Sequence, residues 1–329
     1  MIAAPAPLTV DFHSLGLGKR QALIEDVRQG LAKNPKELPP RWFYDERGSQ
    51  LFELITELPE YYQTRTEAAI LGACAADVAA RVRPETIVEL GAGASTKTRL
   101  LIDAACQQGD LRWFVPFDVS STIVEQSAIE LLQQFPEIAI RAVIGDFGEH
   151  LDRIPRLGRQ LIIFLGSTIG NFLPPARQRF LASVRELMAH GDALLLGVDL
   201  VKDAGELIAA YNDAQGVTAE FNLNVLAVIN NELDGNFDLT AFQHAASYEP
   251  ENAWIEMRLR SLRQQIVRIP GADLVVNFDE GELLRTEISA KFTRQRVEQA
   301  FAGAGLRLAA WYTDDRQRFA EALAVAQEK

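Results

Sequence analysis

The chain has 329 residues, about twice a typical domain, and 48% of them are apolar, so a folded protein of one large or two ordinary domains is expected. Its 45 acidic and 33 basic residues leave a formal net charge of −12, which argues against a nucleic-acid partner because such a partner calls for a basic surface. The chain shows neither an apolar run of about 18 residues nor a basic start followed by one, so no membrane span or secretion signal is expected and a cytoplasmic location is predicted.

The residues that bind metals or form disulfides are few and scattered. Cys74 and Cys106 lack CxxC spacing, which favours two reduced thiols. The four histidines form no HxxxH or HxH pair, so no metal site is expected.

Residues 44–67 hold four aromatic side chains among acids, arginines and a glycine. Ser49 is suited to cap a helix that Pro59 ends, with an apolar face made of Leu51, Phe52, Leu54, Ile55 and Leu58. Thr64 and Glu67 have the spacing of a capping box for the next helix. Tyr61 and Tyr62 therefore lie in a short connection between two helices.

Five apolar runs, bounded by turn residues and separated by helical patterns, predict buried parallel strands at 86–90, 112–119, 138–146, 160–166 and 193–200. Strands that alternate with helices form right-handed βαβ units. We therefore expect an α/β fold with a doubly wound, Rossmann-like sheet whose ligands bind at the carboxyl ends of the strands.

The pattern changes after Leu200. Helical patterns at 203–215 and 218–233 precede alternating, strand-like runs at 255–269 and 273–278, and a helix and a closing strand pair follow from Lys291.

The second set of elements reads as an insertion in the α/β domain. We expect a main α/β domain of residues 63–202 plus 291–329, and a smaller α+β lobe of residues 1–62 plus 203–290.

A glycine-containing loop follows the first strand of the α/β domain. Gly91 and Gly93 permit a tight turn and close approach of a ligand to the backbone. Thr96 stands where a dinucleotide fingerprint has its third glycine, which disfavours a dehydrogenase. Glu89, directly before the loop, fits better with a site for S-adenosylmethionine.

Acids also end the next two strands. Asp118 can accept both ribose hydroxyl protons, and Asp146 can accept from an adenine amino group that Phe147 borders. Each acid alone also fits a turn or cap residue, but their joint placement favours a cofactor site. Lys97 either faces the cofactor carboxylate or is a solvated side chain.

Several segments together carry a family resemblance: "LPPRWFYDERGSQLFELITELPEYYQTRTE", "VELGAGASTKTR", "PFDVS", "GDF", "FLGSTIGNF", "LLLGVDLVKD" and "TEISAKF". From about residue 20 to 327 the chain resembles the L-histidine Nα-methyltransferases that begin ergothioneine biosynthesis. The resemblance implies a class I methyltransferase sheet with a second lobe, histidine held between the two lobes, and S-adenosylmethionine as methyl donor. The implied product is the trimethylated histidine, hercynine.

The resemblance also assigns site residues within residues 44–67. It implies that Tyr61 binds the substrate, with Tyr44 and Phe52 lining the same chamber; ring faces suit the quaternary ammonium product, although plain packing also explains Phe52. Tyr61 is in addition a candidate catalytic residue that orients the amine.

For the amino-acid end of histidine, the resemblance names Asn171 and Tyr211. Gly166 and Asn171 follow the fourth strand, at the edge where a substrate is expected. Without the resemblance, Tyr211 would be interpreted as an ordinary helix aromatic.

Imidazole recognition is expected from "RTEISAKF". Residues two apart on a strand share a face, so Glu287 and Ser289 present a carboxylate and a hydroxyl side by side. Such a pair can match an imidazole and leaves other amino acids without partners for these polar groups. Met257 borders the imidazole by resemblance only, and read without the resemblance Glu287 is an exposed strand acid.

The predicted reaction is an in-line displacement by the neutral α-amine of histidine, repeated through the mono- and dimethyl intermediates, by a monomer that needs no metal. Two alternatives remain: an N-methyltransferase of the same family with another amino acid or imidazole-bearing acceptor, and a noncatalytic module that binds histidine or the cofactor.

Overall fold

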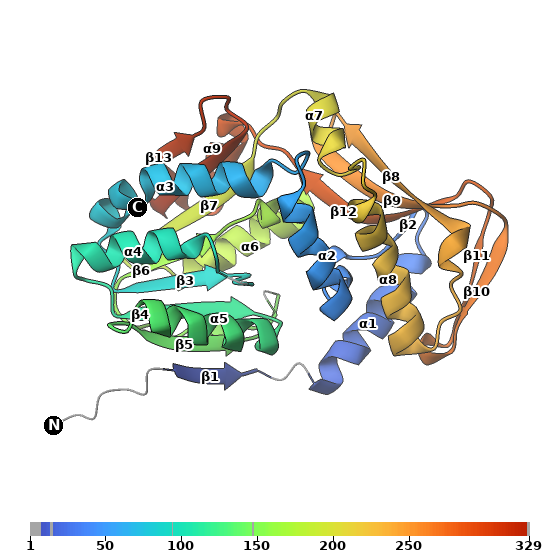
Figure 1. Ribbon diagram of the computed structural model, residues 1–329, viewed down its shortest axis with the longest axis horizontal. Coiled ribbons are helices and arrows are strands. Elements are labelled where there is room, and N and C mark those ends of the chain that lie inside the picture. Colours follow the sequence, from blue (N-terminus) through green and yellow to red (C-terminus); the bar gives the residue numbers. More distant parts are fainter. Residues whose placement is uncertain (1–7, 14–15, 94, 147, 328–329) are drawn as a thin grey trace. The chain divides into compact units, whose positions relative to one another are not determined.

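The computed structural model describes residues 8–13, 16–93, 95–146 and 148–327, which form two compact units. The first unit comprises the described residues of 1–15, 65–200 and 292–329, and the second comprises 16–64 and 201–291. Figure 1 labels most of their helices and strands.

The first unit is built on an eight-stranded sheet with the order β1-β5-β4-β3-β6-β7-β14-β13. Its strands are β1 (Leu8–Phe12), β3 (Thr86–Leu90), β4 (Trp113–Asp118), β5 (Ala139–Ile144), β6 (Gln160–Phe164), β7 (Ala193–Asp199), β13 (Leu306–Thr313) and β14 (Phe319–Ala326). The strands from β1 to β7 are parallel, whereas β14 runs antiparallel to both β7 and β13. The five predicted parallel strands are confirmed, with ends that differ by no more than two residues, and so is the closing strand pair.

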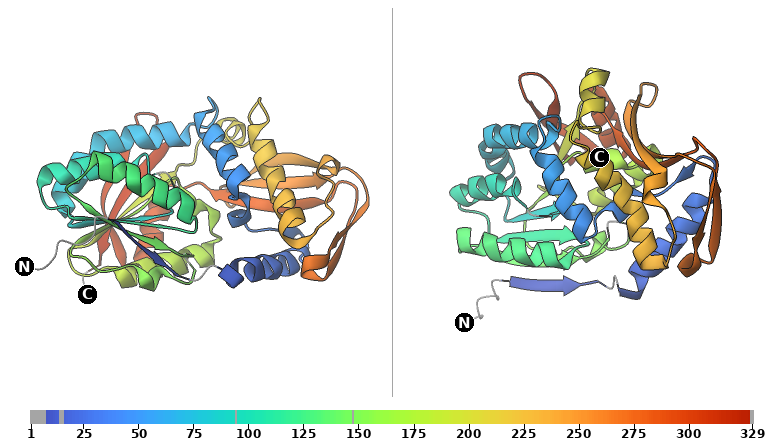
Figure 2. Two further views of the ribbon diagram at one scale, coloured as in Figure 1. Left: turned by 60° about the horizontal axis from the view of Figure 1, so that its bottom comes forward. Right: turned by 45° about the vertical axis from the view of Figure 1, so that its right-hand side comes forward.

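Helices cover both faces of this sheet, as Figures 1 and 2 show. One face carries α3 (Gln63–Val82), α4 (Thr98–Gln108) and α5 (Ser121–Gln134), whose apolar residues form one buried cluster with the strands. The other face carries α6 (Pro174–Leu187) and α9 (Arg294–Gly303). The predicted Rossmann-like, doubly wound architecture is therefore confirmed.

Strand β1 differs from the expectation that all of residues 1–62 belong to the second lobe. It pairs in parallel with β5 over its whole length, from Leu8 opposite Ile140 to Phe12 opposite Ile144. The pairing covers backbone groups that β5 would otherwise expose at the edge of the sheet. This part of the N-terminal segment lies in the main sheet.

The second unit combines a four-stranded sheet, a hairpin and helices. The sheet has the order β2-β12-β9-β8, and β10 pairs with β11. These strands are β2 (Lys36–Glu37), β8 (Phe242–Glu249), β9 (Trp254–Ser261), β10 (Gln265–Ile269), β11 (Leu274–Phe278) and β12 (Leu283–Ala290). The helices are α1 (Gly16–Leu31), α2 (Glu46–Glu57), α7 (Ala204–Ala209) and α8 (Val217–Leu233).

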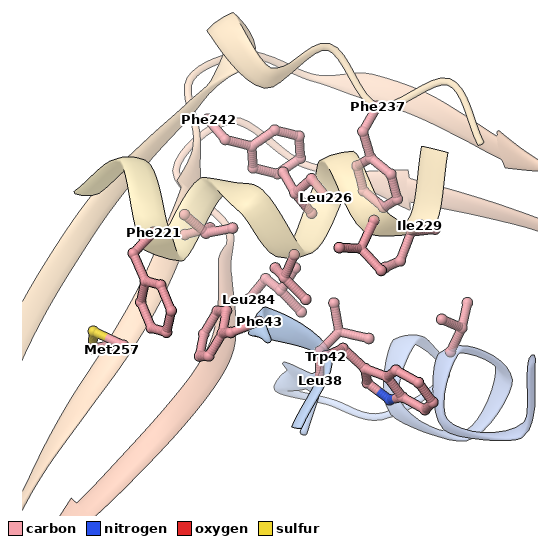
Figure 3. Packing of buried hydrophobic residues seen from close by; sticks show 14 of the residues in the cluster. Leu38, Trp42, Phe43, Phe221, Leu226, Ile229, Phe237, Phe242, Met257 and Leu284 are labelled. Carbon is pink, nitrogen blue, oxygen red and sulfur yellow. The ribbon is translucent and has the colours of Figure 1, made fainter. Parts of the chain in front are cut away.

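The core of the second unit gathers around α8. Phe221, Leu226 and Ile229 of this helix are buried in one cluster with Phe43 and with Leu284 of β12. Figure 3 shows these side chains packed between the helix, the sheet and the N-terminal segment. The smaller α+β unit expected from the sequence is thus present, and it has its own apolar core.

Two local predictions in this unit are wrong. The helix predicted at 203–215 ends at Ala209, because Asp213 accepts hydrogen bonds from the backbone N–H groups of Val217 and Thr218 and so begins α8. The cap of α2 is Asp45, whose carboxylate accepts from the Gly48 N–H at 2.7 Å, and not Ser49, which lies in the helix.

Among the residues that the structure describes, no helix combines the length and the apolar character that crossing a membrane requires.

Candidate active site

The loop after β3 is held in a conformation that glycine favours. Gly91 and Gly93 have φ angles of 72° and 48°, in the left-handed region. The N–H groups of Gly91 and Ala92 donate to the Phe117 carbonyl at 2.8 and 3.2 Å, which ties the loop to the end of β4. A Cβ atom added to Gly93 would meet no atom of the described residues within 4 Å, its chain neighbours aside, so one side of this glycine has room for a ligand.

Glu89 supports this loop from inside the protein. Its buried carboxylate accepts from the Ser95 hydroxyl at 2.7 Å and from the Thr98 hydroxyl. Burial raises the pKa of Glu89 to about 7, although these two donors and Lys97 oppose the shift. The sequence analysis did not identify Ser95 and Thr98, which tie the loop and the start of α4 to this acid of β3.

Asp118 links the ends of two neighbouring strands. Its two carboxylate oxygens accept from the N–H groups of Gly93 at 3.1 Å and of Ser120 at 3.0 Å. Burial raises the pKa of Asp118, and those backbone hydrogen bonds oppose the shift. Because a carboxylate oxygen has two lone pairs, each can still accept from a ribose hydroxyl.

Asp146 follows β5, the next strand in the sheet. Its carboxylate accepts from the Gly148 N–H at 2.7 Å, and its own N–H donates to Nδ1 of His150 at 3.1 Å. The three acids predicted for the cofactor therefore end β3, β4 and β5, which are adjacent. Phe147, predicted beside the adenine, lies outside the described residues.

Lys97 and Gly166 both bind Glu67, a residue that the sequence analysis interpreted as part of a helix-capping box. Glu67, with 0% of its side chain exposed, pairs with the Lys97 ammonium, and its other oxygen accepts from the Gly166 N–H at 2.6 Å. The predicted capping box is wrong, because α3 already begins at Gln63 and places Thr64 inside its first turn. Glu67 instead joins Lys97, the residue before α4, to the turn after β6.

A second carboxyl group, Glu321 of β14, is buried beside Glu67. It has 0% exposure and, among the described residues, no donor to its oxygens. Burial raises the pKa of Glu321 well above its ordinary value, and the charge of Glu67 raises it further. The shift favours the protonated form of Glu321 beside the Glu67 carboxylate.

Replacing Glu321 by glutamine is expected to make the protein less sensitive to alkaline pH. Because its folded-state pKa is raised, Glu321 contributes stability that is complete below about pH 4.5 and is lost as the pH rises toward that pKa, by about 1.4 kcal/mol per pH unit. Glutamine keeps a donor and has no such proton to lose. Urea unfolding at pH 6 and pH 9 should therefore show a stability difference between the variant and the wild type that grows with pH.

The matched control for that measurement is Glu298→Gln, which changes an exposed acid of α9 that pairs with Arg294. It should follow the wild type at both pH values. A difference for Glu321→Gln that stays constant with pH would show that Glu321 is ionised in the folded protein.

In the second unit, four predicted aromatic residues form a continuous row. The Tyr44 and Phe52 rings lie 5.6 Å apart, Phe52 and Tyr61 6.2 Å, and Tyr61 and Tyr211 6.4 Å, all edge to face. Tyr44 is 42% exposed, whereas Tyr61 and Tyr211 are buried. The helix α2 and the connection after it thus bring Tyr61 next to a residue that lies 150 positions later in the chain.

A β-bulge in β12 decides which way Glu287 and Ser289 point. Arg285 pairs with Arg258 but Glu287 pairs with Met257, so Thr286 is an extra residue. Its hydroxyl donates to the Asn222 side chain of α8 at 2.6 Å.

Directly opposite residues of an antiparallel pair share a face, so the bulge places Glu287 and Ser289 beside Met257 and Ile255, on the face of the apolar core. Without the extra residue, the alternation from Leu284 would turn both side chains to the other face. The bulge therefore builds the predicted carboxylate–hydroxyl pair.

Glu287 lies on this face, and the charge of Lys291 partly offsets its own. It keeps some exposed surface, and among the described residues its carboxylate has neither a hydrogen bond nor an ion pair. Burial raises the pKa of Glu287 to about 7, and the charge of Lys291 partly opposes the shift. An accessible carboxylate without a protein donor is suited to accept from a ligand.

Ser289 and Tyr211 form one group with Lys291. The two hydroxyl oxygens lie 2.7 Å apart, and the Lys291 ammonium donates to Ser289 at 2.9 Å and to Tyr211 at 3.0 Å. The sequence analysis missed Lys291. The signal was available, because residues 287, 289 and 291 continue one alternation.

Asn171 ends a short 3-10 helix, η3 (Thr168–Asn171), in the segment that follows β6, and it is half-buried. No three His, Cys, Asp or Glu side chains in the described part of the chain gather in a way that could hold a metal ion.

Comparison with known proteins connects these features to a reaction. A family model described as "Histidine-specific methyltransferase, SAM-dependent" matches residues 23–326. The chain is 52% identical to the Histidine N-alpha-methyltransferase of Mycobacterium tuberculosis (strain CDC 1551 / Oshkosh) over 92% of its own length and 94% of that protein's. It is 50% identical to the Histidine N-alpha-methyltransferase of Mycolicibacterium smegmatis, over 93% and 95% of the two lengths. It is 30% identical to Ergothioneine biosynthesis protein 1 of Neurospora crassa, over 85% of this chain and 32% of the relative.

Proposed function

The chain belongs to the family of histidine-specific, S-adenosylmethionine-dependent methyltransferases, and on that premise we propose that it trimethylates the α-amino nitrogen of L-histidine to give hercynine. This reaction would be the first step of ergothioneine biosynthesis. The observation that carries the proposal is the Glu287 carboxylate, which has no donor within the described part of the chain, on the same strand face as the Ser289 hydroxyl; such a pair matches an imidazole.

The first unit supplies the residues that would hold the methyl donor. The open side of Gly93 accommodates a ligand next to the backbone, and the Asp118 oxygens, each with a lone pair left, suit the two ribose hydroxyls. Asp146 is proposed for the adenine amino group and Lys97 for the cofactor carboxylate. When bound, S-adenosylmethionine supplies a methyl group on a positively charged sulfur.

The second unit supplies the residues proposed for the imidazole. Glu287 accepts the ring N–H, Ser289 contacts the other ring nitrogen, and Met257, directly opposite Glu287 in the sheet, borders the ring. A substrate without both ring nitrogens would leave these polar groups unpaired, which can reduce kcat/KM by several orders of magnitude. Tyr211 and Asn171 are proposed for the amino-acid end.

The aromatic row is proposed for the reacting amine. Tyr61 orients the unprotonated amine, so that alignment supplies most of the rate enhancement. As methyl groups accumulate, the nitrogen loses its N–H donors, and the row of Tyr44, Phe52 and Tyr61 attracts the resulting cation by about 0.5–2 kcal/mol.

Mass spectrometry of the product tests the proposal. Purified protein with histidine and S-adenosylmethionine should give successive increments of one CH2, ending at hercynine, with three S-adenosylhomocysteine formed per product. Tryptophan and histamine, assayed in parallel, cover other amino acids and imidazole-bearing acceptors. Turnover of one of these without turnover of histidine would move the assignment to another acceptor, and binding without turnover would indicate a noncatalytic module.

Two further predictions concern the oligomeric state and the cellular location of the enzyme. We expect a monomer that acts in the cytoplasm on histidine and its mono- and dimethyl intermediates. Light scattering coupled to size-exclusion chromatography tests the first point.

A further inference from the structure

Lys291 is a buried cation that the proposed reaction does not yet use. Its side chain is 1% exposed, and its ammonium lies 4.6 Å from the centre of the Tyr211 ring. Both hydroxyl groups that it contacts, those of Tyr211 and Ser289, belong to the proposed substrate site. A buried ammonium is costly unless it is well hydrogen-bonded, and a residue such as methionine could fill the same volume.

The hydrogen bonds of this group restrict what it can offer a ligand. An ammonium only donates, so it occupies one lone pair on each hydroxyl oxygen. The 2.7 Å contact between the oxygens needs the proton of one of them. Only one hydroxyl proton is then left to point away from the group.

The direction of the shared hydrogen bond follows from the chemistry of the two hydroxyls. A phenol is a stronger donor than an aliphatic alcohol, and an ammonium that donates to its oxygen strengthens it further. The greater acidity of the phenol favours Tyr211 as the donor to Ser289 in this hydrogen bond. The Ser289 oxygen then accepts from both Lys291 and Tyr211, which fills its two lone pairs and leaves it only as a donor.

We propose that Lys291 is a positioning residue that makes Ser289 an obligate hydrogen-bond donor to the ring nitrogen of histidine that carries no proton. The inference rests on the proposed function and deepens it. Glu287 accepts from one ring nitrogen and Ser289 donates to the other, so the site recognises the neutral imidazole by a donor–acceptor pair. Without the ammonium, Ser289 has a lone pair to spare and can accept as readily as it donates.

The test is a comparison of two ligands in two lysine variants. The ligands are histidine and a pyrrolylalanine in which a C–H replaces the acceptor nitrogen of the ring. Lys291→Met removes the ammonium at similar volume. Lys202→Met is the matched control, because Lys202 also donates to a phenol, that of Tyr62 at 2.6 Å, and also lies 4.6 Å from its ring centre.

Affinities are measured by calorimetry in the presence of S-adenosylhomocysteine. Lys291→Met should weaken histidine binding by about tenfold or more while changing pyrrolylalanine binding by less than about threefold, because only histidine uses the Ser289 donor. Lys202→Met should leave the ratio of the two affinities unchanged. A purely structural role of Lys291 would weaken both ligands equally, and that result would overturn the proposal.

A second variant and a readout that does not depend on turnover make the test decisive. If Lys291→Met does not fold, Ser289→Ala removes the proposed donor directly, and it must show the same selective loss for histidine; equal losses or no loss would refute the proposal. Because the test of Lys291 measures binding, the proposal about Lys291 can be refuted while the wild type still methylates histidine. Equally, a wild type without turnover would contradict the proposed function while the affinity ratio still reports on Lys291.

Discussion

Replacing Glu287 by alanine is expected to lower kcat/KM for histidine by about tenfold to a hundredfold. The variant leaves the ring N–H of the substrate without an acceptor in a buried site, and a hydrogen bond to a charged group is worth about 1.5–3 kcal/mol. Discrimination against tryptophan should fall as well, because no unpaired carboxylate then opposes a different ring. Steady-state kinetics with both amino acids measures the two effects.

Glu282→Ala is the matched control for this variant. It removes an acid from the turn just before β12, where Glu282 pairs with Lys36, outside the proposed site. Histidine kinetics should then resemble those of the wild type. If Glu287→Ala retains full selectivity, the imidazole is recognised elsewhere and the proposed substrate assignment fails.

The raised pKa of Glu287 links its function to stability. A pKa of about 7 means that folding favours the neutral form, so the contribution of Glu287 to stability is complete below about pH 4.5 and is lost as the pH rises through about 7. Only the ionised form accepts from the imidazole without donating. Glu287→Gln should therefore be more stable than the wild type at pH 8 and less active. The ionised Glu287 of the wild type thus lowers stability while it provides selectivity.

The parallel strands of the first unit were predictable because strands buried on both faces are short apolar runs with turn residues at their ends. The end of each strand then located Glu89, Asp118 and Asp146. The sheet order brings them together, as the fold rule predicts. The residues that hold these acids in place, such as Ser95 and Thr98, were hidden because a hydroxyl in a loop has many equivalent interpretations.

Tertiary contacts decided what the sequence left open. Thr64 and Glu67 have the spacing of a capping box, yet Glu67 binds Lys97 and the Gly166 N–H, because a buried carboxylate is more stable with an ammonium and a backbone donor. At the bulge, the Thr286 hydroxyl donates to Asn222 of α8, which lies 64 positions earlier in the chain. Period-two alternation correctly groups Glu287 with Ser289, but it cannot tell which face of the sheet they occupy.

Asp118→Ala is expected to weaken the binding of S-adenosylmethionine by about a hundredfold. Its carboxylate is proposed to accept both ribose hydroxyl protons, and two hydrogen bonds to a charged acceptor account for about this factor. The same oxygens hold the N–H groups of Gly93 and Ser120, so the loop also loses its attachment to β4. Calorimetry with S-adenosylhomocysteine and with S-adenosylmethionine measures the change without turnover.

The comparison of Asp118→Asn with Asp118→Ala separates the two roles of the carboxylate. Asparagine keeps one oxygen, which can still accept from one backbone N–H, but it loses the charge and the second acceptor, so an intermediate affinity is expected. Asp103→Ala changes an exposed acid of α4 whose partner is Gln107, and it should bind the cofactor as the wild type does. Since Glu287 lies in the other unit, Glu287→Ala should retain cofactor affinity while Asp118→Ala loses it. An affinity for Asp118→Ala within about threefold of the wild type would place the ribose away from β4 and refute the cofactor assignment.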